Sequence, residues 1–130
     1  MREKIGDVQK LGHAEAAERT EIAGADTAEQ QAVIDKVIAG LREIYDPEIP
    51  LNVYDLGLIY KLTLGRENEV KVEMTLTAPG CPVAGEIVAE VKRKVQGIEG
   101  VRRAEVELVW EPAWTRERLS EAARLELGLM

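Results

Sequence analysis

The single cysteine of the chain, Cys81, stands in a stretch whose residue types suit sulfur chemistry, Thr75-Leu76-Thr77-Ala78-Pro79-Gly80-Cys81-Pro82. Apolar residues alternate before this stretch and recur at helical spacing after it, so Cys81 is expected where a strand turns into a helix N-terminus. Free backbone N–H groups and the positive end of the helix dipole favour a thiolate there, by roughly 0.3–1 kcal/mol if the site is exposed.

A thiol that only packs in the core is the alternative, since free cysteine is among the most buried residue types. We favour the reactive or metal-binding role, because a buried structural cysteine rarely needs a Pro-Gly-Cys-Pro turn around it. The only histidine, His13, lies in a poorly patterned N-terminal stretch. The usual general base for a cysteine nucleophile is therefore missing from the patterned part of the chain.

Three carboxylates, Asp46, Glu48 and Asp55, fall in one irregular stretch that carries two prolines and a glycine. Spacing alone favours turn roles, with Asp46 ending a helix and Asp55 bonding nearby backbone N–H groups. A metal site built on these carboxylates would more often include a histidine or a second cysteine.

The elements that must position these residues follow from hydrophobic periodicity. Thr27-Ala28-Glu29-Gln30 has the form of a capping box and opens the first helix. The pattern predicts the order helix, strand, strand, helix, strand, helix, at residues 27–45, 58–64, 69–77, 82–96, 101–110 and from Thr115 or Ser120 to Leu127. The inward strand positions are expected to include Leu58, Tyr60, Leu62, Leu64, Ala104, Val106, Leu108 and Trp110.

The outward strand positions are charged, with both signs present, as suits a sheet face open to water. They are Lys61, Lys71, Glu73, Arg103, Glu105 and Glu107. We therefore expect an α/β (α+β) two-layer sandwich, a three-stranded mixed sheet with helices on one face only. A right-handed crossover makes the third strand parallel to the second, which pairs antiparallel with the first. Two tryptophans, Trp110 and Trp114, are expected to close the core after the last strand.

Composition places limits on function. The chain has 130 residues, enough for one domain, which we assign to residues 27–130, with residues 1–26 as a flexible tail. A net charge of −7 argues against nucleic acid as the main partner. One cysteine fits a reducing compartment, so we expect a cytoplasmic protein. No signal peptide or membrane-spanning run is recognisable, so no membrane partner is expected.

Four blocks of the sequence resemble the signature blocks of the SufT-like, MIP-type iron–sulfur cluster assembly family, a domain also present in PaaD-type oxygenase accessory proteins. The blocks are Asp46-Pro47-Glu48-Ile49, Asn52-Val53-Tyr54-Asp55-Leu56-Gly57-Leu58-Ile59, Thr75 to Pro82, and Trp110-Glu111-Pro112-Ala113-Trp114 followed by Leu119-Ser120-Glu121. Their common order makes the resemblance specific. The chain lacks the cysteine-rich C-terminal extension of PaaD-type members, which favours the general assembly role.

The resemblance implies a small α/β domain that helps to mature or deliver iron–sulfur clusters and is not an enzyme. It implies a functional cysteine at Cys81, with Asp46, Glu48, Asp55 and Thr77 in one candidate site. It also implies scaffold or carrier proteins and client apoproteins as partners, and no permanently bound cofactor.

One cysteine cannot hold a conventional cluster, which takes four protein ligands. Cys81 could pair with its copy in a homodimer, act as a transient cluster ligand during handover, or contact a partner's cysteine without binding iron. Three other functions stay open: a thiol-dependent enzyme, an oxygenase accessory, and a partner-binding module in which Cys81 only packs.

Overall fold

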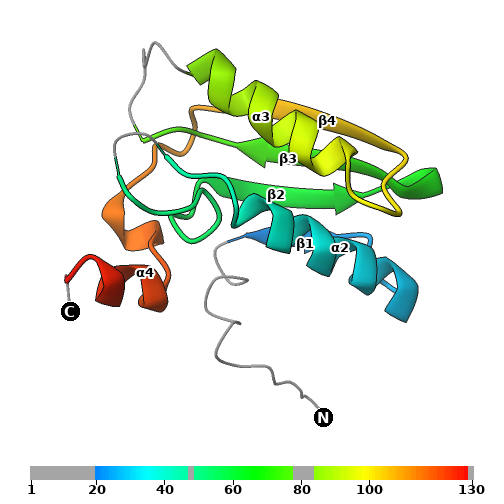
Figure 1. The fold of residues 1–130 in the computed structure, drawn as a ribbon, viewed down its shortest axis with the longest axis horizontal. Helices are drawn as coiled ribbons and strands as arrows, with labels where there is room; N and C mark the ends of the chain where they lie inside the picture. Colours follow the sequence, from blue (N-terminus) through cyan, green and yellow to red (C-terminus); the bar gives the residue numbers. More distant parts are fainter. Residues whose placement is uncertain (1–19, 47–48, 78–83, 129–130) are drawn as a thin grey trace.

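The computed structural model describes residues 20–46, 49–77 and 84–128. The elements are β1 (Glu21–Ala23), α2 (Ala28–Leu41), β2 (Ile59–Leu64), the 3-10 turn η1 (Arg66–Asn68), β3 (Glu69–Met74), α3 (Ala84–Gln96), β4 (Arg103–Leu108), the 3-10 turn η2 (Arg116–Arg118) and α4 (Glu121–Glu126). Helices α2 and α3 lie on one face of the sheet, and α4 lies apart from them (Figure 1). The predicted α/β sandwich with helices on one face is confirmed.

The sheet has the order β1-β2-β3-β4. Strands β2 and β3 pair antiparallel, and β3 and β4 pair parallel, as the right-handed crossover through α3 predicts. The two parallel strands therefore end at the same edge of the sheet. Met74, the last residue of β3, lies opposite Leu108, the last residue of β4.

The sheet has four strands, so the prediction of a three-stranded sheet is wrong by one strand. Residues Glu21–Ala23, which the sequence placed in a flexible tail, form β1 and pair parallel with β2. Just before β1, the Thr20 hydroxyl donates to the Ile59 carbonyl at 2.7 Å. After β1, Gly24 has a φ of +90°, and a Cβ there would lie 2.0 Å from the Leu64 carbonyl oxygen. Three residues are too few to show a period-2 pattern, which is why this strand escaped prediction.

Helix α2 begins where the capping box predicts. The Thr27 side chain accepts from the Gln30 N–H, and the Gln30 side chain accepts from the Thr27 N–H. The helix ends at Leu41, earlier than predicted, and Arg42 is its C-cap. The chain therefore enters the following loop four residues before Asp46.

Two residues that were predicted to face the core, Tyr60 and Trp110, are not buried in it. The register of β2 against β3 shifts between Ile59 and Lys61, and this irregularity buries Ile59 completely and leaves Tyr60 partly exposed. Trp110, two residues past the end of β4, is 41% exposed. The buried core is otherwise aliphatic, as expected for a chain without phenylalanine, and within the described residues Tyr54 is its only aromatic member.

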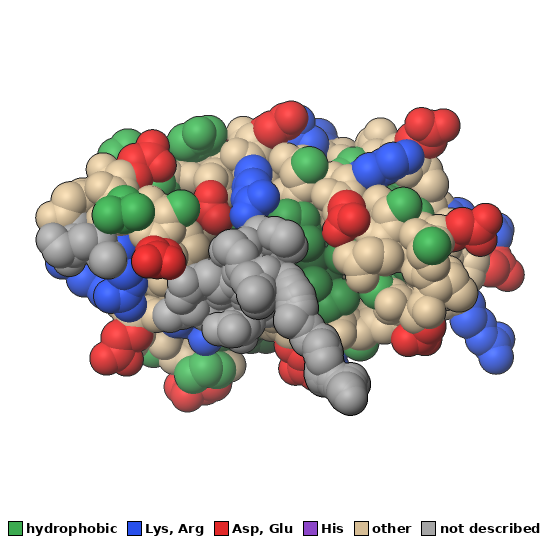
Figure 2. Space-filling view, turned by 90° about the horizontal axis from the view of Figure 1, so that it is seen from below, with side chains coloured by type: hydrophobic (Ala, Val, Ile, Leu, Met, Phe, Trp, Pro, Cys, Tyr) green, Lys and Arg blue, Asp and Glu red, His purple; other side chains and the backbone are tan. Residues whose placement is uncertain are grey.

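The opposite face of the sheet carries cross-strand ion pairs, as its mixed charges predict. Lys71 lies 3.1 Å from Glu107, and Lys61 lies 3.8 Å from Glu21. Figure 2 shows acidic and basic side chains interspersed over the part of the drawn face where side chains are coloured. That mixture agrees with the argument from net charge against a nucleic-acid surface.

Candidate functional site

The loop between α2 and β2, residues 42–58, carries two of the predicted site residues in described positions, Asp46 and Asp55. We call it the Asp55 loop. Asp46 is buried, and its Oδ1 accepts from the Ile49 N–H at 3.1 Å, while its own N–H donates to the Leu51 carbonyl at 3.0 Å. These are the bonds of a tight turn, but the predicted role of Asp46 in ending the first helix is wrong, because α2 already ends at Leu41.

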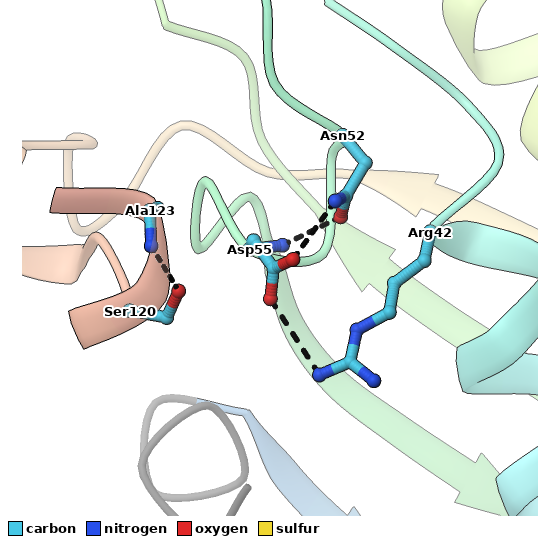
Figure 3. Close-up of polar contacts among 5 residues, drawn as sticks. All are labelled: Arg42, Asn52, Asp55, Ser120 and Ala123. Atoms are coloured by element: carbon cyan, nitrogen blue, oxygen red, sulfur yellow. Dashed lines mark hydrogen bonds and ion pairs between the residues drawn. The ribbon is translucent and has the colours of Figure 1, made fainter. Parts of the chain in front are cut away.

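Asp55 is held by side chains rather than by the backbone N–H groups that the sequence suggested (Figure 3). Asn52 Nδ2 donates to Asp55 Oδ2 at 2.8 Å, and the Asp55 N–H donates to Asn52 Oδ1 at 2.8 Å. Arg42 Nη2 lies 3.6 Å from Asp55 Oδ1. Arg42 therefore offsets the charge of Asp55, and the carboxylate is fixed on both of its oxygens.

Tyr54 anchors the same loop in the core. Its side chain is 3% exposed, and the Arg42 guanidinium lies 5.1 Å from its ring centre. Burial raises the pKa of the Tyr54 phenol, and the nearby Arg42 charge acts against that rise. Arg42 thus contacts both Tyr54 and Asp55, which ties the start of the loop to its end.

The C-terminal segment, residues 112–123, packs against the Asp55 loop and the start of β2 through their backbone. The Ser120 N–H donates to the Asp55 carbonyl at 3.0 Å, Trp114 Nε1 donates to the Leu56 carbonyl at 2.6 Å, and Arg118 Nε donates to the Gly57 carbonyl at 3.0 Å. Three consecutive carbonyls of the loop are therefore satisfied by residues that follow about sixty positions later in the chain.

Two further contacts strengthen this packing. The Tyr60 hydroxyl donates to the Pro112 carbonyl at 2.6 Å, and the Arg118 guanidinium lies 3.9 Å from the Tyr60 ring centre. Burial raises the pKa of Tyr60, and the Arg118 charge opposes it. Gly57 has a φ of +79°, and a Cβ there would lie 2.3 Å from the Arg118 carbonyl oxygen. Only glycine allows the two segments to approach so closely.

The end of β3 meets the Asp55 loop at a defined point. The Thr75 N–H donates to the carbonyl of Leu58, the last loop residue, at 2.9 Å. On the other side, the Val109 N–H donates to the Met74 carbonyl at 2.8 Å. Thr75 is buried, and Thr77 is partly buried two residues further on. The described start of the block that contains Cys81 therefore lies against the end of the Asp55 loop.

Of the five predicted site residues, the structure describes Asp46, Asp55 and Thr77, whereas Cys81 and Glu48 lie outside the described residues. Over the ranges 20–46, 49–77 and 84–128, no group of three or more His, Cys, Asp or Glu side chains is placed to hold a metal ion. In the same ranges, no helix has both the length and the apolar character needed to cross a bilayer.

Sequence reasoning did not predict the contacts that organise this site, which are made by Arg42, Asn52, Trp114 and Arg118. The Asn52–Asp55 pair could have been found, because an Asn and an Asp three residues apart often close a turn. The contacts of Trp114 and Arg118 could not, because each joins residues 58 or 61 positions apart.

The fold and the site define a small two-layer α/β protein with one thiol. Its Asp55 loop lies against the start of the block that contains Cys81. Comparison with known proteins identifies the family to which the chain belongs. A family model for iron–sulfur cluster assembly proteins matches residues 34–108. The Fe-S protein maturation auxiliary factor of Porphyromonas gingivalis is 48% identical over 96 residues, which cover 74% of this chain and 91% of that protein.

Two further similar proteins support the same family. The Fe-S protein maturation auxiliary factor SufT of Staphylococcus aureus is 37% identical over 86 residues, covering 66% of this chain and 98% of SufT. A crystal structure from Bacillus anthracis, of a domain of unknown function called DUF59, superposes with a TM-score of 0.70 at 38% identity, covering 77% of this chain and 95% of that one. The chain belongs to the iron–sulfur cluster assembly protein family, and the predicted SufT-like assembly or maturation role is confirmed.

Proposed function

We propose that this protein is an iron–sulfur maturation factor that delivers clusters to apoproteins through Cys81 and catalyses no reaction of its own. The observation that carries the proposal is the hydrogen bond from Thr75 to Leu58, because it holds the acidic loop against the start of the cysteine block. Family membership supplies the cargo, since relatives are named as maturation auxiliary factors and as iron–sulfur cluster carrier proteins.

Within this site the carboxylates have different tasks. Asp46 and Asp55 already make hydrogen bonds and an ion pair inside the loop, so their task is to hold its shape. Glu48 is the acidic side chain that we assign to contact with iron or with a partner protein, since carboxylate oxygen is a suitable hard ligand. Thr77, which lies in the same sequence block as Cys81, is the remaining residue that we assign to the site.

The cluster is cargo and not a resident cofactor. Conventional clusters take four protein ligands, and this chain brings one cysteine. We propose that Cys81 supplies one thiolate ligand during handover, while the other ligands come from the donating scaffold or carrier and then from the client apoprotein. A second copy of this chain, in a homodimer, is the other source of a thiolate. A free thiol with this task suits the reducing cytoplasm.

Anaerobic incubation of the purified protein with ferrous iron and sulfide tests this proposal. Ultraviolet–visible absorption reports a bound cluster, and native mass spectrometry reports whether one or two chains hold it. The sample is then mixed with the apo form of an enzyme that needs a [4Fe–4S] cluster, and recovery of that enzyme's activity is followed. We expect Cys81→Ser to keep the wild-type melting temperature and to lose recovery.

A control is Glu99→Gln, which changes an acidic side chain that is 94% exposed. Its ion pair with Lys36 is long, at 4.0 Å, and so contributes little. This variant is expected to behave as wild type in each measurement. Full recovery of the client with Cys81→Ser would show that this thiol does not carry the function.

A further inference from the structure

The outer edge of β4 is the longer of the two edges of the sheet. The strand order is β1-β2-β3-β4, and among the described residues β4 pairs with β3 alone. The other edge strand, β1, has three residues, whereas β4 has six. An edge strand presents a row of backbone N–H and C=O groups to which another strand can bind. The edge of β4 is therefore a place where a further chain could join the sheet.

The hydrogen bonds at the end of β4 show which backbone groups face this edge. The Val109 N–H, one residue past the strand, donates to the Met74 carbonyl of β3 at 2.8 Å. Along a strand, the backbone groups of successive residues point to opposite sides. Counting back from Val109, the odd-numbered residues bond toward β3. Ala104 and Val106 therefore direct their N–H and C=O groups to the open edge.

Two side chains of opposite charge on β4 lack an ion pair. Arg103 and Glu105 are both exposed, and neither lies within 4.0 Å of an opposite charge in the part of the chain that the structure describes. The third charged residue of the strand, Glu107, is already paired with Lys71 at 3.1 Å. Charges on an edge strand often prevent pairing. Here the two signs stand two positions apart, so an antiparallel copy of β4 can bring each charge beside its opposite.

Charge distinguishes the registers that such a copy could adopt. A two-fold axis at Glu105 sets that carboxylate against its own copy and offers Arg103 only Glu107, which already has a partner. An axis at Val106 sets Glu105 against Glu107 twice. Like charges directly opposite each other destabilise a sheet. An axis at Ala104 instead places Arg103 of each copy opposite Glu105 of the other.

The register about Ala104 also fits the backbone. Because Ala104 directs both of its backbone groups to the edge, it exchanges two hydrogen bonds with its own copy on the axis. Arg103 and Glu105 then face each other in non-hydrogen-bonded pairs, whose Cα atoms lie only about 4.5 Å apart and whose side chains interact closely. The core faces of the two sheets lie on the same side, because the axis is on a residue and not between two residues.

We propose that the outer edge of β4 binds a second copy of this chain, antiparallel about a two-fold axis at Ala104, so that the two four-stranded sheets join into one. The reciprocal charges of Arg103 and Glu105 identify the occupant, since a two-fold interface requires a surface that is complementary to itself. The interface uses none of the residues assigned to the candidate site, so it does not depend on the proposed function.

Sedimentation equilibrium of the 130-residue protein over a range of concentrations tests the interface. A metal chelator and a reductant are present, so that neither a bound cluster nor a disulfide at Cys81 can join two chains. We expect wild type to dimerise. Arg103→Glu and Glu105→Arg should each weaken dimerisation roughly tenfold, because two attractive pairs become two repulsive ones. The double variant, which exchanges the two charges, should return to within about threefold of wild type.

Lys36→Glu is the matched control for Arg103→Glu, because it makes the same change of charge on α2, over the opposite half of the sheet (Figure 1). It should dimerise as wild type does. Amide hydrogen exchange locates the interface. The Ala104 N–H should exchange more slowly as the wild-type concentration rises and should show no such slowing in Arg103→Glu. Melting temperatures close to that of wild type show that each variant is folded.

Four results would overturn the inference. They are a wild type that stays monomeric at every concentration, a dimer that the single reversals do not weaken, a double variant as weak as the single ones, and a dimer without slower exchange at Ala104. A monomer that binds an apo client protein in a complex lost with Arg103→Glu would give this edge to a client strand and overturn it as well. Cluster transfer by Cys81→Ser decides the proposed function separately, because that variant is expected to dimerise as wild type does.

Discussion

The Asp55 loop and the end of β3 lie side by side and differ in how completely their polar groups are satisfied. In the loop, both oxygens of Asp55 have partners, and the carbonyls of Asp55, Leu56 and Gly57 each accept a bond from the C-terminal segment. At the end of β3, the buried Thr75 hydroxyl has none. The difference separates a loop held by several hydrogen bonds from a strand end that buries a hydroxyl without one.

This comparison assigns tasks within one small site. A loop whose described residues are held by many bonds can meet a partner without adjusting its shape, which lowers the entropy cost of binding. Substitutions that remove the bonds of the loop should therefore lower the stability of the protein.

The largest effect on stability is expected from Gly57→Ala. The new Cβ would lie 2.3 Å from the Arg118 carbonyl oxygen, on a residue whose φ is +79°. Left-handed strain and displacement of the C-terminal segment together should cost about 3 kcal/mol. Urea unfolding followed by circular dichroism measures this change.

Gly65→Ala is the matched control for Gly57→Ala, because the nearest atom to a Cβ at Gly65 is an ordinary 3.6 Å away. It should change the free energy of unfolding by less than about 1 kcal/mol. Equal stability of Gly57→Ala and Gly65→Ala would show that the C-terminal segment does not fix the loop.

A smaller effect separates the two acidic residues of the loop. Asp55→Ala removes the acceptor of Asn52 and the partner of Arg42, which should cost about 1–2 kcal/mol of unfolding free energy. Glu48→Ala is expected to keep the wild-type melting temperature and to lower cluster transfer to the client. The pair is measured by thermal unfolding and by the transfer assay described above.

Asp55→Asn refines this comparison, because it keeps an oxygen for Asn52 and loses only the charge that faces Arg42. It should lie between wild type and Asp55→Ala in stability. The assignment is reversed if Glu48→Ala lowers the melting temperature while Asp55→Ala spares it and abolishes transfer.

The smallest effect concerns pH. Burial raises the pKa of Tyr54, so the folded state holds the phenol proton more tightly than the unfolded state, whose pKa is about 10. This contribution to stability is fully present below about pH 10 and is lost as the pH rises through the higher pKa of the folded state. Tyr54→Phe should therefore lose less stability than wild type on going to alkaline pH.

The measurement for Tyr54 is the midpoint of urea unfolding at a series of pH values from about 8 to 11. The informative quantity is the slope against pH and not the absolute midpoint. Parallel slopes for wild type and Tyr54→Phe would contradict the raised pKa.

Most of the architecture could be predicted from local sequence signals. The capping box at Thr27 and Gln30 and the crossover between β3 and β4 each depend on residues close together in the chain. The errors arose where distant contacts decide the outcome. Strand β1 exists because β2 offers it an edge, and Tyr60 is partly exposed because the register of β2 shifts against β3.

The site was less predictable for the same reason. A turn at Asp46 could be predicted and is observed in its bond to Ile49, but the helix end that the sequence placed there lies at Leu41 instead. The ion pair of Asp55 with Arg42, and the contacts of Trp114 and Arg118, need the folded arrangement of segments that lie far apart in sequence. The assembly role came from the resemblance of four blocks, because no spacing of residues specifies a cargo.

Strand β1 has a practical meaning for how this domain is delimited. A version of the protein begun at Thr27 would lack the three residues that pair with Lys61, Leu62 and Thr63, together with the Thr20 bond to Ile59. The backbone of β2 would then be open along one side, and an unprotected strand edge invites another chain to add to it. Self-association seen only with such a shortened protein would then be a consequence of the exposed edge of β2.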